Sequence, residues 1–152
     1  MKKILISPYS KIMPNGKPNP KNYPYWEELI YLLQQNNYNV TQLNSGNEPT
    51  LKGVDFELKN LPLNQIPGKL NNYDIWISVD NFFAHMAHYY KKYGYVIWGK
   101  SDPLIFGYLE NVNILKDRKC LRTNQFWFWF DEPYDESVFL EPKEIIKLIP
   151  HA

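Results

Sequence analysis

Residues 73–103, YDIWISVDNFFAHMAHYYKKYGYVIWGKSDP, contain the clearest structural pattern in the chain. Tyr73–Val79 is a short apolar run rich in Ile, Val and Trp, which is typical of a strand buried on both faces of a parallel sheet. A helix over about Phe82–Lys92 follows, and Tyr95–Trp98 predicts a second strand. The apolar residues of this helix fall at helical spacing on one face, which we expect to be buried: Phe83, Met86, Ala87 and Tyr90. The stretch therefore predicts one strand, helix and strand unit.

Two polar residues follow each strand of this unit. Asp80 and Asn81 come after the first strand, where either side chain can cap the helix, and Ser101 and Asp102 come after the second. Ligands of doubly wound sheets bind beyond the carboxyl ends of the strands, and the free amides of a first helical turn favour phosphate. These four residues are candidates for a ligand site by position. An ordinary N-cap and an ordinary turn explain them equally well.

The same alternation continues on both sides of this unit. Further strands are expected at Lys3–Ser7, Val40–Leu43, Val54–Leu58 and Val112–Leu115. Helical segments are expected at Tyr25–Asn37, Leu63–Asn72, Leu104–Glu110 and Glu141–Ile149. Strands that alternate with helices predict an α/β fold, here a single Rossmann-like domain with a mainly parallel sheet flanked by helices.

Length and composition limit the class of protein. The chain has 152 residues, 44% of them hydrophobic, so we expect one domain over residues 1–152, with its core over about residues 3–115 and an aromatic C-terminal extension over residues 116–152. A formal net charge of +1 without a basic stripe does not favour nucleic acid as a partner. The single cysteine excludes an internal disulfide, and no apolar run predicts a signal peptide or a membrane span. We therefore expect a cytoplasmic protein.

The motifs resemble those of family 9 glycosyltransferases, the heptosyltransferase-like group. Residues 78–87, SVDNFFAHMA, are similar to a strand ending in Asp followed by Thr-Gly-Pro-x-His-x-Ala, and residues 97–103, IWGKSDP, to a strand ending in Phe-Gly-x-Thr-Asp-Pro. The residues that match in order and spacing are Asp80, His85, Ala87, Gly99, Ser101, Asp102 and Pro103. The chain departs from the family at Phe82-Phe83, which replaces Gly-Pro and hinders close approach of a phosphate to the backbone. Asn81 replaces the Thr and keeps a polar cap.

Three further residues are candidates. Ser10 follows the first strand in a Pro-containing turn, which in the family contacts the donor phosphates; a surface turn explains it equally well. Lys21 begins Lys-Asn-Tyr-Pro, which resembles the family's Lys-x-Trp-Pro, whose lysine approaches the diphosphate; without the resemblance, a solvated lysine is the preferred explanation. Glu48 follows the strand at Val40–Leu43 and is a candidate for a ribose hydroxyl, although an ordinary polar turn is favoured there. The loop over residues 11–20 could close over a ligand.

The sequence lacks the residues of a metal site, a catalytic serine or a Walker phosphate loop. His85 and His88 are three residues apart on one predicted helix, but no carboxylate or cysteine completes a metal-ligand spacing, so we expect neither a metal nor another cofactor. No serine lies at a nucleophile elbow, and a Walker phosphate loop is absent. The sequence identifies no catalytic residue.

Residues 126–130, Phe-Trp-Phe-Trp-Phe, lie among charged residues. An aromatic run this dense must be buried against the domain or against a partner. We expect it to pack on the domain; a partner protein or a second copy of the chain is the alternative.

The resemblance covers residues 3–114 and implies the C-terminal, donor-binding half of a glycosyltransferase of the GT-B arrangement. The implied ligand is a nucleotide diphosphate or nucleotide sugar, with Lys21, Ser101 and the amides after Asp80 on the diphosphate, while His85 and Asp102 orient the donor. Transfer of a hexosyl or heptosyl group also needs a general base and an acceptor site, which a partner chain would have to supply. The alternatives are a protein that sequesters or senses a nucleotide or nucleotide sugar without turnover, and a degenerate fold that serves as an interaction module.

Overall fold

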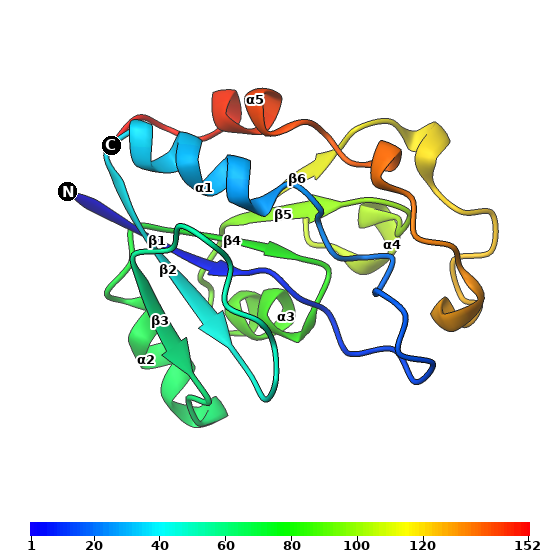
Figure 1. The fold of residues 1–152 in the computed structure, drawn as a ribbon, viewed down its shortest axis with the longest axis horizontal. Coiled ribbons are helices and arrows are strands. Elements are labelled where there is room, and N and C mark those ends of the chain that lie inside the picture. Colours follow the sequence, from blue (N-terminus) through cyan, green and yellow to red (C-terminus); the bar gives the residue numbers. More distant parts are fainter.

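A six-stranded parallel sheet forms the centre of the computed structural model, which describes residues 1–152 (Figure 1). Its strands are β1 (Lys2–Ser7), β2 (Tyr38–Asn44), β3 (Phe56–Lys59), β4 (Ile75–Val79), β5 (Tyr95–Trp98) and β6 (Val112–Leu115). They lie in the order β3-β2-β1-β4-β5-β6, and every neighbouring pair is parallel. This is the strand order of a doubly wound Rossmann sheet. The predicted α/β fold with a parallel sheet is confirmed.

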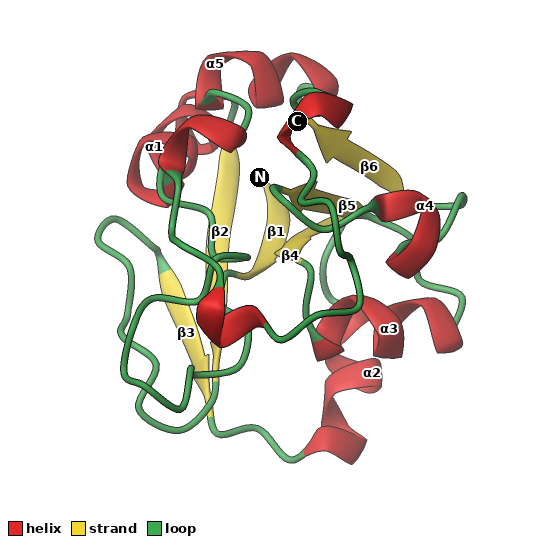
Figure 2. Ribbon diagram, turned by 90° about the vertical axis from the view of Figure 1, so that its right-hand side faces the viewer, coloured by secondary structure: helices red, strands yellow, loops and turns green.

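Helices cover both faces of the sheet. In Figures 1 and 2, α1 (Trp26–Gln35) and α5 (Pro142–Ile145) lie on one face, and α2 (Ile66–Leu70) and α3 (Phe82–Tyr89) lie on the other. The short α4 (Pro103–Phe106) follows β5. Single 3₁₀ turns occupy Leu63–Gln65, Arg118–Cys120, Trp129–Asp131, Glu136–Val138 and Ile146–Leu148. None of the helices has the length and apolar character that crossing a lipid bilayer requires.

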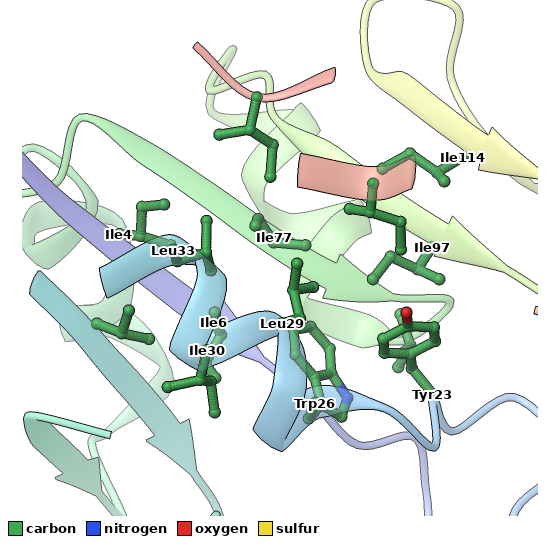
Figure 3. Packing of buried hydrophobic residues seen from close by; sticks show 14 of the residues in the cluster. Ile4, Ile6, Tyr23, Trp26, Leu29, Ile30, Leu33, Ile77, Ile97 and Ile114 are labelled. Carbon is green, nitrogen blue, oxygen red and sulfur yellow. The ribbon is translucent and has the colours of Figure 1, made fainter. Parts of the chain in front are cut away.

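The central strands are buried on both faces because their residues alternate between two apolar layers. Ile4 and Ile6 of β1 pack with the apolar face of α1, as Figure 3 shows, whereas Leu5 belongs to the layer of α2 and α3. All three are fully buried. The first layer also contains four residues beyond the 3–115 span that we predicted for the core: Val138, Phe139, Ile145 and Ile149. The C-terminal part of the chain is therefore a part of the core.

Helix α3 follows the prediction at its start and differs at its end. Asn81 is the N-cap, and its side-chain oxygen accepts a hydrogen bond from the amide of Ala84 at 3.2 Å. The predicted buried face is correct for Phe83, Met86 and Ala87. It is wrong for Tyr90, which is 49% exposed, because the helix ends at Tyr89 and Tyr90 is the C-cap.

The prediction that the aromatic run packs on the domain is wrong. Phe126, Trp127, Phe128 and Phe130 are 79%, 56%, 61% and 42% exposed, and only Trp129 is half-buried. The physical reason is a buried arginine that binds the backbone of the run. The guanidinium of Arg122 donates to the carbonyl groups of Gln125, Trp127 and Phe128, so much of the backbone faces the domain while most of the rings face solvent.

Candidate functional site

Two neighbouring pockets open at the carboxyl ends of β1 and β4, where the strand order reverses. The larger, which we name the aromatic pocket, has a cavity volume of about 560 Å³. Its polar and aromatic lining residues include Ser10, Asn19, Lys21, Asp80, Asn81, Phe82, His85, Phe128, Trp129 and Phe130. Doubly wound sheets bind their ligands at this place.

The smaller, which we name the strand-end pocket, has a cavity volume of about 280 Å³ and reaches the carboxyl end of β2. Glu48 lines it, and burial raises the pKa of that carboxyl group. One Glu48 oxygen accepts a hydrogen bond from the amide of Ser45 at 2.9 Å. Four residues line both pockets: Ser10, Lys11, Asn81 and Phe82. A single extended ligand could therefore occupy both pockets.

An ion pair lies in the aromatic pocket. The Lys21 ammonium is 2.9 Å from Oδ2 of Asp80, the residue that directly follows β4. The Lys21 backbone is held as well, because its amide donates to the side-chain oxygen of Asn19 at 2.9 Å. Ser10 also contacts both Asp80 and the residues next to Lys21. Its hydroxyl donates to the Asp80 carbonyl group, and its amide donates to the side chain of Asn22 at 2.8 Å.

Asn81 fixes the turn between β4 and α3. Its side-chain nitrogen donates to the Ser7 hydroxyl at 2.9 Å and to the Tyr9 carbonyl group at 3.1 Å, while its oxygen caps the helix. The Asn81 side chain is therefore engaged within the protein. The first amides of a helix have no partner inside the helix, and that of Ala84 is taken by Asn81, so the amides of Phe82 and Phe83 are the ones left for a ligand.

His85 lines the aromatic pocket from α3, and its ring is oriented by a tyrosine. Nδ1 of His85 lies 2.8 Å from the Tyr108 hydroxyl. The Tyr108 ring stacks on the His88 ring with centroids 3.7 Å apart, and Nε2 of His88 is 3.4 Å from Glu110. A hydrogen bond from its own backbone amide, together with His88, lowers the pKa of Glu110. Because Nδ1 is engaged with Tyr108, Nε2 is the nitrogen of His85 left to contact a ligand.

Ser101 and Asp102 line neither pocket. The Asp102 carboxylate caps α4 by accepting from the Leu104 amide, and it receives two hydrogen bonds from the Arg118 guanidinium at 3.1 and 2.7 Å. The bond from Arg118 holds the pKa of Asp102 below its usual value. Ser101 is buried, and its hydroxyl has no hydrogen-bond partner. Contact of these two residues with a donor stays a prediction.

Five of the predicted residues thus share one pocket: Ser10, Lys21, Asp80, Asn81 and His85. Sequence reasoning missed Lys11, Tyr108 and the aromatic wall. Lys11 is one of two lysines in the loop over residues 11–20, and Tyr108 is one of twelve tyrosines, so neither carries a distinguishing signal in the sequence. The aromatic run was a signal, but it was interpreted as packing. Nowhere in the chain do three or more His, Cys, Asp or Glu side chains form a group that could hold a metal ion.

No protein-family model matches the sequence, and no curated protein matches it. Solved structures do match. The ADP-heptose LPS heptosyltransferase II of E. coli superposes with a TM-score of 0.65 at 14% identity, over 96% of this chain and 44% of that one. The chain has the fold of a heptosyltransferase domain. The predicted likeness to one half of a GT-B glycosyltransferase is confirmed for the fold.

Two further heptosyltransferases match in the same way. TibC of enterotoxigenic E. coli, a dodecameric iron-containing heptosyltransferase in complex with ADP-D-β-D-heptose, has a TM-score of 0.62 at 16% identity over 92% of this chain and 35% of TibC. E. coli heptosyltransferase WaaC with ADP has a TM-score of 0.61 at 15% identity, over 97% of this chain and 44% of WaaC. The chain therefore spans less than half the length of each of these enzymes.

Proposed function

We propose that this chain binds a nucleotide diphosphate or nucleotide sugar as the donor-binding half of a glycosyltransferase. The observation that carries the proposal is the convergence of Lys21, Lys11 and the first amides of α3 where the aromatic pocket meets the strand-end pocket. Cations and free helix amides are groups that bind a diphosphate.

The two pockets suggest how such a ligand would lie. The diphosphate occupies the junction formed by Ser10, Lys11, Asn81 and Phe82, where Lys11 supplies a second cation. The nucleoside occupies the strand-end pocket, where Glu48 accepts a hydrogen bond from a ribose hydroxyl. This arrangement agrees with the general position of nucleotides at the switch point of a Rossmann sheet.

The ion pair between Lys21 and Asp80 affects how strongly a diphosphate would bind. Asp80 neutralises Lys21 and holds it beside the junction. A diphosphate that arrives there shares the ammonium with Asp80 or draws it away. Asp80 therefore keeps the cation in place before binding and weakens its attraction for the phosphate.

Glycosyl transfer also needs a general base and an acceptor site. The only carboxylate in the aromatic pocket is Asp80, which is paired with Lys21. We therefore propose that an acceptor half outside these 152 residues supplies the base. The second candidate function, which the same observation favours, is binding of the nucleotide or nucleotide sugar without turnover.

A thermal-shift screen tests the proposal. The probes are ADP, UDP, GDP and CDP with their commercially available sugars, and the control is the double variant Lys21→Met/Asp80→Asn, which removes the ion pair without leaving an unpaired charge. A ligand at about 100 times its dissociation constant adds near 2.7 kcal/mol, which raises the melting temperature by several degrees. We expect a shift for the wild type that is smaller for the control. Release of the free nucleotide in the presence of acceptors would separate transfer from simple binding.

A further inference from the structure

We infer that the aromatic pocket is a saccharide site, in which the aromatic loop, residues 126–130, provides the stacking surface for a sugar ring. The inference rests on the proposed function and assigns one part of the ligand. The strand-end pocket takes the nucleoside, and the aromatic pocket takes the glycosyl group beyond the diphosphate.

The loop is built to hold its rings outward. The Arg122 guanidinium, whose side chain is only 6% exposed, donates to the carbonyl groups of Phe128 at 3.2 Å and Gln125 at 3.3 Å. The buried Gln125 side chain accepts from the Asp102 amide at 2.9 Å and donates to the Lys100 carbonyl group at 2.8 Å. Buried polar groups joined in this way fix a loop in one conformation. The exposure of the rings therefore follows from the packing of the loop's own backbone.

The loop also forms one wall of the ligand pocket. The centroid of the Trp129 ring lies 3.4 Å from the Arg122 guanidinium carbon and 5.1 Å from the Lys21 ammonium nitrogen. Trp129 therefore brings the loop next to the Lys21–Asp80 pair. The Phe130 carbonyl group accepts a hydrogen bond from the Asn15 side chain at 3.1 Å, which joins the loop to the segment after β1. Phe128 and Phe130 stack on each other with centroids 5.2 Å apart.

The chemistry of the pocket suits a sugar better than a protein surface. A sugar ring has an apolar C–H face, which packs against an aromatic ring, and an edge of hydroxyl groups, which need charged or polar partners. The pocket offers the exposed rings of Phe82, Phe128 and Phe130 beside Asp80 and His85. Its volume of about 560 Å³ lies within the range of small-molecule sites, roughly 300–1,000 Å³. Charged residues are depleted at the centre of protein interfaces, whereas an ion pair lies inside this pocket.

Two double variants of the aromatic loop test the inference, because each removes two exposed rings but only one of them changes the pocket lining. Phe128→Ala/Phe130→Ala removes two rings that line the pocket, and Phe126→Ala/Trp127→Ala removes two rings of the same loop that do not. All four rings are exposed, so neither variant opens the core. Calorimetry compares ADP with ADP-glucose, UDP with UDP-glucose and GDP with GDP-mannose on the wild type and both variants.

We expect the wild type to bind at least one nucleotide sugar about tenfold more tightly than its diphosphate, the gain of a good aromatic contact. Phe128→Ala/Phe130→Ala loses most of this gain and binds the diphosphate as the wild type does. Phe126→Ala/Trp127→Ala keeps the gain. Equal affinity for sugar and diphosphate, or an equal loss in both variants, would overturn the inference and leave the loop as a surface for a protein partner.

The inference and the proposed function fail separately. If no diphosphate binds, the proposed function is wrong, and saturation-transfer NMR with methyl glycosides of glucose, mannose and galactose then decides the inference. A signal that the wild type gives and Phe128→Ala/Phe130→Ala loses supports a saccharide site. No signal for the wild type rejects it.

Discussion

The Lys21 ammonium lies 2.9 Å from Oδ2 of Asp80 and joins the segment after β1 to the carboxyl end of β4. The Asp80 side chain is 8% exposed and the Lys21 side chain 23%, so the pair is largely withdrawn from water. Removing one member of such a pair leaves the other charge poorly solvated. The pair therefore has consequences for stability as well as for binding.

Lys21→Met leaves the buried Asp80 carboxylate without its partner. We expect the free energy of unfolding to fall by about 1–3 kcal/mol, the desolvation cost of an unpaired polar group. Adding Asp80→Asn restores most of the loss because the charge is gone. Urea denaturation of the wild type, both single variants and the double variant measures the coupling. Strictly additive losses would show that the two side chains do not interact in solution.

The pair of Asp102 and Arg118 predicts a pH-dependent stability. The hydrogen bond from Arg118 lowers the pKa of Asp102 in the folded state. The stability from this pair is thus fully present above the unfolded pKa of about 3.9 and is lost as the pH falls through the lower folded pKa. Arg118→Gln should lower the melting temperature at pH 7, and the deficit should shrink as the pH falls below the unfolded pKa of about 3.9. An equal deficit at pH 7 and at low pH would exclude the charged pair as its source.

Tyr108→Phe tests whether the tyrosine orients His85. The hydroxyl lies 2.8 Å from Nδ1 of His85, whereas the ring stacked on His88 is retained in the variant. Loss of a hydrogen bond worth about 1 kcal/mol predicts roughly fivefold weaker binding of a nucleotide sugar, measured by calorimetry. His85→Ala is the control and should bind at least as weakly. Unchanged affinity in Tyr108→Phe together with weak binding in His85→Ala would separate the histidine from its tyrosine.

Arg122→Lys tests the origin of the exposed rings. Lysine keeps the charge but lacks the planar group that contacts several carbonyl groups and the Trp129 ring. We expect the amides of Phe126 and Trp127, which donate to Asn124, to exchange about tenfold or more faster while the exchange of β1 and β4 is unchanged. Protection of the loop equal to that of the wild type would mean that Arg122 does not hold it.

The sheet could be predicted from the sequence because its signals are local. Buried parallel strands such as Ile75–Val79 are short apolar runs, and polar residues such as Asp80 mark their carboxyl ends. The closeness of Lys21 to Asp80 was predicted from a resemblance between motifs. Without that resemblance, Lys21 would have been interpreted as a solvated surface lysine.

The aromatic wall could not be predicted because it depends on contacts between distant residues. Aromatic rings are usually buried, so the run at residues 126–130 was assigned to packing. Nothing in the sequence shows that Arg122 binds the backbone of that run, or that Asn15 reaches the Phe130 carbonyl group. The partner of Asp102 is a similar case, because Arg118 is one of many cations that could pair with it.

We place the nucleotide diphosphate where the aromatic pocket and the strand-end pocket meet. A chain of 18.1 kDa is suited to ¹⁵N-labelled NMR titration, which reports both affinity and place. Titration with ADP, UDP, GDP and CDP should move the amide signals of Ser10, Lys11 and Phe82–Ala84 in a saturable way for at least one of them. No saturable change with any diphosphate, or changes confined to the opposite edge near Met1 and Asn37, would contradict the account.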